Sequence, residues 1–212
     1  NLPVGSLAIE LVSLALDRGE RQLINVAPWP AFNYQPHAAF SIAHNGSHIF
    51  LKYYVKEKSI AAVNRQTNGP VYKDSCVEFF IAFDGDENYY NVEFNCAGTG
   101  HIGFGNRKDD RQAIPVKLVE KIRYQTSLRT GSDFEDNLIH WELSLILPVD
   151  IFYHHRMDSL KNKPCRVNFY KCGDELPQPH YLTWSAISSD APNFHLPEFF
   201  GSARFNDNEH GV

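Results

Sequence analysis

Two runs of alternating side chains, over residues 76–82 and 89–95, constrain the fold of this chain more than any other feature. The first run carries an apolar row formed by Val77, Phe79 and Ile81. The second run carries an apolar row formed by Tyr90, Val92 and Phe94. Because successive side chains of a strand point to opposite faces, the pattern predicts two β-strands within Tyr72 to Asn95, joined by the polar turn at residues 84–88.

The opposite face of this predicted hairpin is polar. Strand register follows the buried apolar face, so Glu78 is expected beside Asn91, Glu93 and Asn95, with Tyr72 at the edge of the patch. Carboxylates and amides next to an aromatic ring suit the hydroxyls and the apolar C–H face of a sugar. A second interpretation is that this is the ordinary solvent-facing side of an antiparallel sheet.

Length and charge exclude several other classes of protein. At 212 residues and 24.2 kDa, the chain is predicted to form one domain over residues 1–212. Its net charge is −5, and it contains no run rich in Lys or Arg, which argues against a nucleic-acid partner. No apolar run approaches the roughly 20 residues needed to span a bilayer, so no membrane span is predicted.

The four cysteines give no disulfide framework. Cys165 and Cys172 flank one candidate strand and would lie too far apart to bridge, and Cys76 and Cys96 fall on opposite faces in the register above. We therefore expect free, mostly buried thiols. No Cys-x-x-Cys pair or Cys/His cluster is present, so the sequence predicts no metal site.

The rest of the chain is typical of short antiparallel strands. Residues 38–44 and 48–56 flank Asn45-Gly46, a strong hairpin signal. Further strands are predicted over residues 116–128, 141–147, 165–171 and 180–187. The pattern as a whole predicts an all-β fold, an antiparallel β-sandwich of the jelly-roll or immunoglobulin-like kind.

The segments between these strands are expected to be irregular, with one short helix between Asp150 and Leu160. The apolar run from Leu7 to Leu16 suits a strand or a short helix equally well. The glycine-rich stretch over residues 97–105 is predicted to be a flexible connection. Trp29 and Trp141 are assigned to the core, and His195 is expected to be hydrogen-bonded within a packed C-terminal segment.

Four motifs, in order along the chain, resemble one family of proteins. They are Tyr72 with residues 74–81 and Tyr89-Tyr90, then Trp141-Glu142-Leu143 running to Pro148, then Val167-Asn168-Phe169 with Trp184-Ser185, and finally residues 194–201. Together they resemble the family 9 carbohydrate-binding modules and their relatives in the wider DOMON-like superfamily. The resemblance covers the chain from about Ala38 to Phe205.

This resemblance implies non-catalytic carbohydrate binding by a β-sandwich, with a sugar held between two aromatic side chains over a polar sheet face. The two aromatic positions fall on Tyr72, where the family commonly has tryptophan, and on Trp184. The sugar-facing carboxylate falls on Glu78. The remaining polar positions of the site fall on Asn91, where the family has arginine, and on Glu93 and Tyr170.

The resemblance also implies a setting for the protein. Its partners are expected to be mono- or oligosaccharides and polysaccharide ends, in polysaccharide degradation beside glycoside hydrolases. Secretion to an extracellular, periplasmic or cell-surface location follows from that setting. No cofactor is required, although family members carry structural calcium, which Asp84, Asp86, Glu87 and Asn88 could bind. A solvated hairpin tip accounts for the same four residues.

Two other functions fit parts of the sequence. Glu78 and Glu93, on neighbouring strands, could act as the paired carboxylates of a glycoside hydrolase. Some domains of the superfamily ligate haem through methionine and histidine, for which Met157, His154 and His155 are the candidates. An exposed polar segment with an incidental methionine explains those three residues as well.

Overall fold

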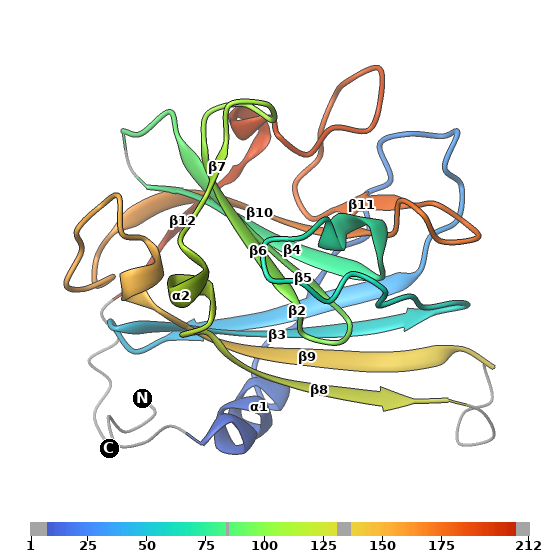
Figure 1. The fold of residues 1–212 in the computed structure, drawn as a ribbon, viewed down its shortest axis with the longest axis horizontal. Coiled ribbons are helices and arrows are strands. Elements are labelled where there is room, and N and C mark those ends of the chain that lie inside the picture. Colours follow the sequence, from blue (N-terminus) through green and yellow to red (C-terminus); the bar gives the residue numbers. More distant parts are fainter. Residues whose placement is uncertain (1–7, 84, 131–136, 207–212) are drawn as a thin grey trace.

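The computed structural model describes residues 8–83, 85–130 and 137–206, and these form two antiparallel β-sheets packed face to face (Figure 1). The predicted all-β sandwich is therefore confirmed. One sheet has the order β1-β2-β3-β9-β8, with β1 at Gln22–Leu23, β2 at His37–His44, β3 at His48–Glu57, β9 at Ile139–Pro148 and β8 at Arg123–Arg129.

The second sheet contains the central hairpin. Its order is β11-β10-β4-β5-β6-β7, with β11 at Tyr181–Thr183, β10 at Pro164–Cys172, β4 at Cys76–Phe83, β5 at Tyr89–Asn95, β6 at Gly100–Gly105 and β7 at Gln112–Ala113. Strand β12, at Gly201–Arg204, also pairs with β10. The helical elements are α1 at Ile9–Asp17, α2 at Val116–Val119, and the 3-10 turns η1 at Val71–Lys73, η2 at Val149–Ile151 and η3 at Pro197–Phe199.

Both predicted hairpins are present, and the predicted register of the central one is confirmed. In β2 and β3, His44 lies opposite Ile49 across the Asn45-Gly46 turn, where Gly46 has a φ of 90°. In β4 and β5, Glu78 lies opposite Glu93 and Phe79 opposite Val92. The predicted apolar rows of β4 and β5 consequently face the other sheet, and the carboxylates face away from it.

The core lies between the two sheets and is rich in aromatic rings. Phe169 of β10 stacks between Phe40 and Phe79, with ring centroids 3.6 and 5.0 Å away. Trp141 is 1% exposed in the same cluster, as predicted. The four cysteines are free and buried, which also agrees with the sequence.

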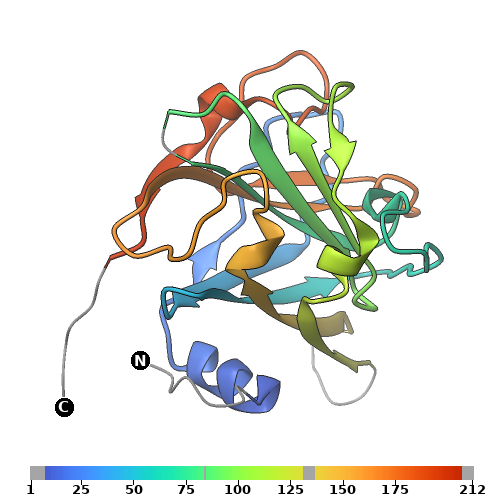
Figure 2. The ribbon, with the colours of Figure 1, turned by 60° about the vertical axis from the view of Figure 1, so that its left-hand side comes forward.

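Both outer faces of the sandwich are covered as well. Helix α1 packs Val12 and Leu16 against the outer face of the five-stranded sheet, on the side away from the second sheet (Figures 1 and 2). Trp29 and the C-terminal segment around Phe194 cover part of the second sheet's outer face. The polar row of the central hairpin is buried, with Asn91 and Asn95 at 0% exposure and Glu78 and Glu93 at 3%, so the interpretation of this face as solvent-facing is wrong.

The glycine-rich stretch is a strand rather than the predicted flexible connection. Gly100 and Gly103 belong to β6, which pairs along its length with β5. A Cβ atom on Gly100 would lie 2.6 Å from the ring of Phe94, so a side chain there would collide with the neighbouring strand. The glycines thus permit close approach of side chains within the sheet.

Two other segments differ from the predicted secondary structure, and a third, which suited a strand or a helix equally well, is a helix. Residues 116–128 form the short helix α2 followed by β8, because Val119 and Ile122 both turn into the core and break the strand alternation. The helix expected after Asp150 is limited to η2. The ambiguous N-terminal run is helical, as α1. None of the described helices is long and apolar enough to cross a membrane.

A buried ion pair joins the two sheets. Glu57 of β3 and Lys171 of β10 both have 0% exposed side chains, and Oε2 of Glu57 lies 3.1 Å from Nζ of Lys171. Trp141 donates its indole N–H to Glu57 Oε1 at 2.6 Å. Lys171 Nζ also lies 2.8 Å from Nε2 of His180, and burial lowers the pKa of His180 to about 3, so a neutral imidazole accepts this hydrogen bond.

Replacing Lys171 with methionine should destabilise the protein by about 3–5 kcal/mol, because Glu57 would be left as an unpaired buried carboxylate. The double variant Glu57→Gln/Lys171→Met removes both charges and should recover part of that loss. Denaturant unfolding of the two variants and the wild type measures the difference. A double variant no more stable than Lys171→Met would contradict the role assigned to this pair.

Candidate functional site

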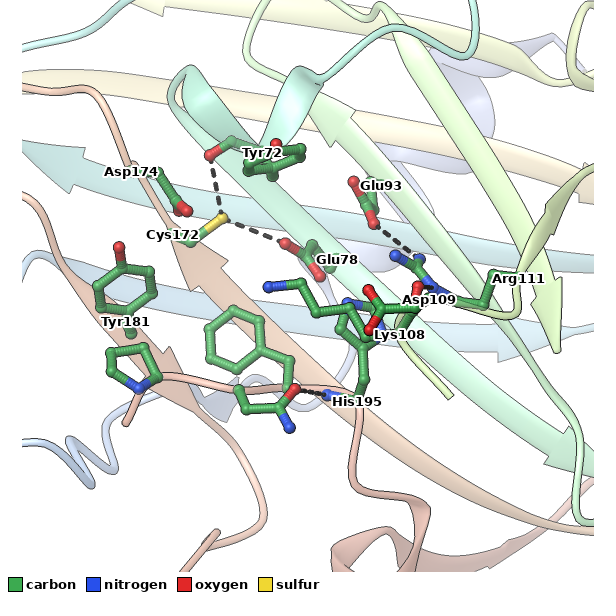
Figure 3. Close-up of a pocket in the computed structure, with 13 residues that line it drawn as sticks. Tyr72, Glu78, Glu93, Lys108, Asp109, Arg111, Cys172, Asp174, Tyr181 and His195 are labelled. Carbon is green, nitrogen blue, oxygen red and sulfur yellow. Dashed lines mark hydrogen bonds and ion pairs between the residues drawn. The ribbon is translucent and has the colours of Figure 1, made fainter. Parts of the chain in front are cut away.

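A pocket of about 300 Å³ opens over the outer face of the second sheet, above the central hairpin (Figure 3). Its floor comes from β4, β5 and the end of β10. Its sides come from η1, the β6–β7 connection, β11 and residues 192–195. The volume lies at the lower end of the range of about 300–1,000 Å³ that is typical of small-molecule sites.

Two carboxyl groups, from Glu78 and Glu93, occupy the floor of the pocket. The residues are cross-strand partners, so their side chains project side by side from the same face. Both residues are 3% exposed. Burial raises the pKa of Glu78 well above its ordinary value, and repulsion from the nearby Glu93 is the second cause. Glu78 can therefore carry a proton and donate a hydrogen bond as well as accept one.

Glu93 is held by two neighbours that are themselves positioned by the sheet. Asn91 Nδ2 donates to Glu93 Oε1 at 2.5 Å, and Arg111 Nη1 lies 3.6 Å from the same oxygen. A Cβ atom on Gly103 would lie 2.5 Å from Oδ1 of Asn91, so the glycine leaves room for the amide. Arg111 brings a guanidinium to the site from the β6–β7 connection, although Asn91 occupies the position where the family has arginine.

Aromatic side chains form the walls of the pocket. Tyr72 of η1 is 41% exposed at one side, and Tyr181 of β11 and Phe194 lie at the others. Phe194 is fixed from below by Tyr170, which stacks on it with ring centroids 4.2 Å apart and donates its hydroxyl to the carbonyl of Phe194 at 3.1 Å. The wall is thus rigid on the Phe194 side and open on the Tyr72 side.

His195 closes the pocket opposite Tyr72 (Figure 3). Its Nδ1 lies 2.9 Å from the hydroxyl of Tyr89, and its backbone N–H donates to Asn193 Oδ1 at 3.0 Å. Burial lowers the pKa of His195 far below its ordinary value, and the positive charges of Arg111 and Lys108 lower it further. The ring is therefore neutral. The predicted hydrogen bonding of His195 is confirmed, and the residue also lines the pocket.

The structure divides the six predicted site residues into three groups. Tyr72, Glu78 and Glu93 line the pocket. Asn91 and Tyr170 are fully buried behind it, where they position Glu93 and Phe194. Their roles are supporting ones in this geometry.

Trp184 lies elsewhere, so the expected pairing of Tyr72 and Trp184 across one site is corrected. Thr183 lies opposite Tyr170, and the next residue alternates to the face that points at the other sheet. There the Trp184 ring meets Phe169 and Phe40 edge-on, with centroids 5.8 and 6.2 Å away. Tyr181 and Phe194 are the aromatic side chains that share the pocket with Tyr72.

Several lining residues were missed by sequence reasoning. They are Lys108, Asp109 and Arg111 in the β6–β7 connection, Cys172 and Asp174 after β10, and Tyr181 and Asn193. The charged run over residues 107–111 is visible in the sequence, but its place beside the pocket follows from the pairing of β6 with β5, which was not predicted. Nothing in the local pattern around Asp174 or Asn193 indicated their proximity to Glu78.

The residues considered for calcium and haem have other contacts. Asp84 lies outside the described residues. Asp86 Oδ1 accepts from the backbone of Asn88 at 2.8 Å, and its Oδ2 lies 3.0 Å from Nε2 of His155. The other nitrogen of His155 lies 3.0 Å from the hydroxyl of Tyr90, so both ring nitrogens are engaged. Met157 packs against the core between the sheets.

The comparison with protein families gives one match over most of the chain. The model described as carbohydrate-binding family 9 matches residues 10–205. A comparison with curated proteins gave no significant match.

Solved structures resemble the whole fold. A crystal structure described as a "putative carbohydrate-binding protein" from Bacteroides uniformis ATCC 8492 is 40% identical, covers 94% of this chain and 93% of that chain, and has a TM-score of 0.86. A family 9 carbohydrate-binding module from Caldicellulosiruptor kristjanssonii in complex with glucose is 9% identical, with coverages of 93% and 90% and a TM-score of 0.61. The complex with cellotriose is 11% identical, with coverages of 90% and 84% and a TM-score of 0.54. At these identities the two Caldicellulosiruptor structures support the fold alone.

Asp174 should make the stability of the protein depend on pH. Burial is the main cause that raises its pKa from 3.8 to about 6. Between these values the folded state keeps a proton that the unfolded state has lost, so the contribution of Asp174 to stability falls as the pH rises from 4 to 6. Asp174→Asn should therefore gain stability relative to wild type over that range, by on the order of 1–2 kcal/mol.

Thermal unfolding at pH 4, 5, 6 and 7 measures this difference. Glu120→Gln, which removes an exposed carboxylate away from the pocket, controls for a general loss of negative charge. A stability gap between Asp174→Asn and wild type that stays constant with pH would refute the assignment.

Proposed function

Because the chain belongs to carbohydrate-binding family 9, we propose that it binds a carbohydrate in the pocket above β4 and β5. The observation that carries this proposal is the pair Glu78 and Glu93, which lie side by side at the floor of a cavity with aromatic walls. Adjacent hydroxyls of a sugar ring require adjacent polar groups that accept and donate hydrogen bonds. Non-catalytic binding is consistent with the family.

The floor of the pocket suits two neighbouring hydroxyls. Glu93 is oriented by Asn91 and Arg111, so its free oxygen is presented at a fixed place. Glu78 is in contact with Cys172, whose Sγ lies 3.1 Å from Oε1. Hydrogen bonds to pre-oriented groups require little ordering on binding, which favours affinity.

Tyr72 is proposed as the main stacking surface for the sugar. It is the most exposed aromatic side chain among the three that line the pocket, and η1 fixes its backbone next to β4. Phe194 and Tyr181 bound the sugar on the other sides. This arrangement replaces the Tyr72–Trp184 clamp inferred from the family resemblance.

The small volume of the pocket, about 300 Å³, favours a monosaccharide, an oligosaccharide or the end of a polysaccharide over the middle of a long chain. Lys108, Arg111 and residues 192–195 line the pocket on the sides away from Tyr72, which is its most exposed aromatic side chain. We extend the proposal to a role in polysaccharide degradation, outside the cytoplasm and alongside glycoside hydrolases. Fractionation of the source cells and co-purification with such enzymes test that setting.

Calorimetric titration with glucose, cellotriose and a panel of other mono- and oligosaccharides tests the site. Glu78→Ala should weaken binding about tenfold or more, because it removes the partner of a sugar hydroxyl, and a buried group left without its hydrogen bond costs about 1–3 kcal/mol. Tyr72→Ala should weaken binding by a similar factor through loss of the stacking surface.

Tyr153→Ala provides the matched control for the aromatic variant. Tyr153 is also 41% exposed, and it lies outside the pocket. Its removal should leave the dissociation constant unchanged. Binding that is equally weakened by Tyr72→Ala and Tyr153→Ala, or by neither, would rule out the proposed stacking surface.

Hydrolysis is the second candidate function, favoured by one observation. Glu78 has a raised pKa and lies beside Glu93, which is in contact with Arg111. Two carboxyl groups with different environments are the usual acid and base of a glycosidase. We expect no release of phenol from aryl glycosides by the wild-type protein. Turnover that is present in the wild type and lost in Glu78→Gln would reverse this conclusion.

A further inference from the structure

Two cysteines that are far apart in the sequence meet next to the pocket. Cys76 of β4 and Cys172 of β10 are direct cross-strand partners, and both are free and buried. Glu78 lies two residues after Cys76, so its side chain projects from the same face of the sheet. The three side chains therefore form a cluster at the floor of the pocket.

The ligating atoms of this cluster are close enough to share one cation. The two Sγ atoms and a carboxylate oxygen of Glu78 all lie within 4.8 Å of one another. Cys172 Sγ is 3.1 Å from Glu78 Oε1 and 3.5 Å from the carbonyl oxygen of Tyr72. Ligands held about 2.3 Å from a tetrahedral zinc ion lie about 3.8 Å apart, so small side-chain rotations would complete the geometry.

We propose that Cys76, Cys172 and Glu78 form a binding site for a thiophilic divalent cation, with Zn²⁺ as the leading candidate. Two sulfur ligands and one carboxylate are a donor set that zinc accepts. Calcium and magnesium require oxygen ligands and are disfavoured by the two thiols. This site is different from the acidic turn at residues 84–88.

Binding changes the protonation of the cluster in a defined way. Each thiol releases its proton to solvent as its sulfur forms a bond to the metal, and so does the Glu78 carboxyl where it carries a proton; no oxidant or reductant takes part. Two thiolates and one carboxylate then carry three negative charges, of which the cation neutralises two. Lys108 and Arg111 line the same pocket and provide positive charge nearby.

The position of the cluster implies an open side. Cys172 and Glu78 line the pocket, whereas Cys76, which lies beside Cys172 in the sheet, does not. A cation bound by all three would face the pocket with its fourth coordination position, where water or an added ligand could bind. The proposal does not depend on carbohydrate binding, because the metal can be detected without any sugar.

Titration of the reduced, metal-free protein with Cd²⁺ and Zn²⁺ tests the site. Cd²⁺ should produce the ultraviolet charge-transfer absorption of a cadmium–thiolate bond and saturate at one equivalent, and one equivalent of Zn²⁺ should prevent it. Cys76→Ser and Cys172→Ser should each weaken binding at least tenfold.

Cys96→Ser and Cys165→Ser are the matched controls. Both thiols are buried, and they contact the backbone carbonyls of Ala61 and Ala203. These variants should bind Cd²⁺ as the wild type does. A wild-type protein with no saturable absorption, or binding that survives the loss of either cluster cysteine, would overturn the proposal.

X-ray absorption of the zinc-loaded wild type keeps the test decisive if a cluster variant fails to fold. Two sulfur atoms at about 2.3 Å and oxygen at about 2.0–2.2 Å are expected around the zinc. A shell of nitrogen and oxygen alone would place the metal elsewhere and refute the site.

Discussion

The ion pair between Glu57 and Lys171 is the constraint on which the site depends. It holds a charged residue of β10 on the face that points at the other sheet, at 0% exposure. Because strand residues alternate, Tyr170 and Cys172 on either side of Lys171 must point outward, toward the pocket. A shift of β10 by one residue would turn Tyr170 and Cys172 toward the core. It would also leave the buried Glu57 carboxylate without a partner.

Burial of the polar face gives the central hairpin its chemical character. An exposed row of carboxylates and amides would be hydrated and weakly selective, but here it is covered by the C-terminal segment and bounded by aromatic rings. The covered environment raises the pKa of Glu78 and lowers that of His195. Both groups can therefore be neutral in the pocket, and neutral groups exchange hydrogen bonds with sugar hydroxyls at a small desolvation cost.

The sequence predicted the sandwich, both hairpins, the register of the central one and the outward direction of Glu78 and Glu93, because strand periodicity is a local property. It failed where a position depends on distant partners. Trp184 matches a family motif, yet its face is set by the pairing of Thr183 with Tyr170. Cys76 lies opposite Cys172 because β4 pairs with β10, a strand far from it in the sequence. The glycines of β6 were read as flexible because the ring of Phe94 above Gly100 is visible only in three dimensions.

The β6–β7 connection has a consequence for how proteins of this type diversify. Lys108 and Asp109 line the pocket but do not belong to the core of the sandwich. They are exposed, and so are the residues around them. Substitutions there can alter the charge and shape presented to a ligand while the strands and their packing stay intact. This part of the ligand preference is thus encoded in a stretch on which the core does not depend, so it can change through mutation without loss of the fold.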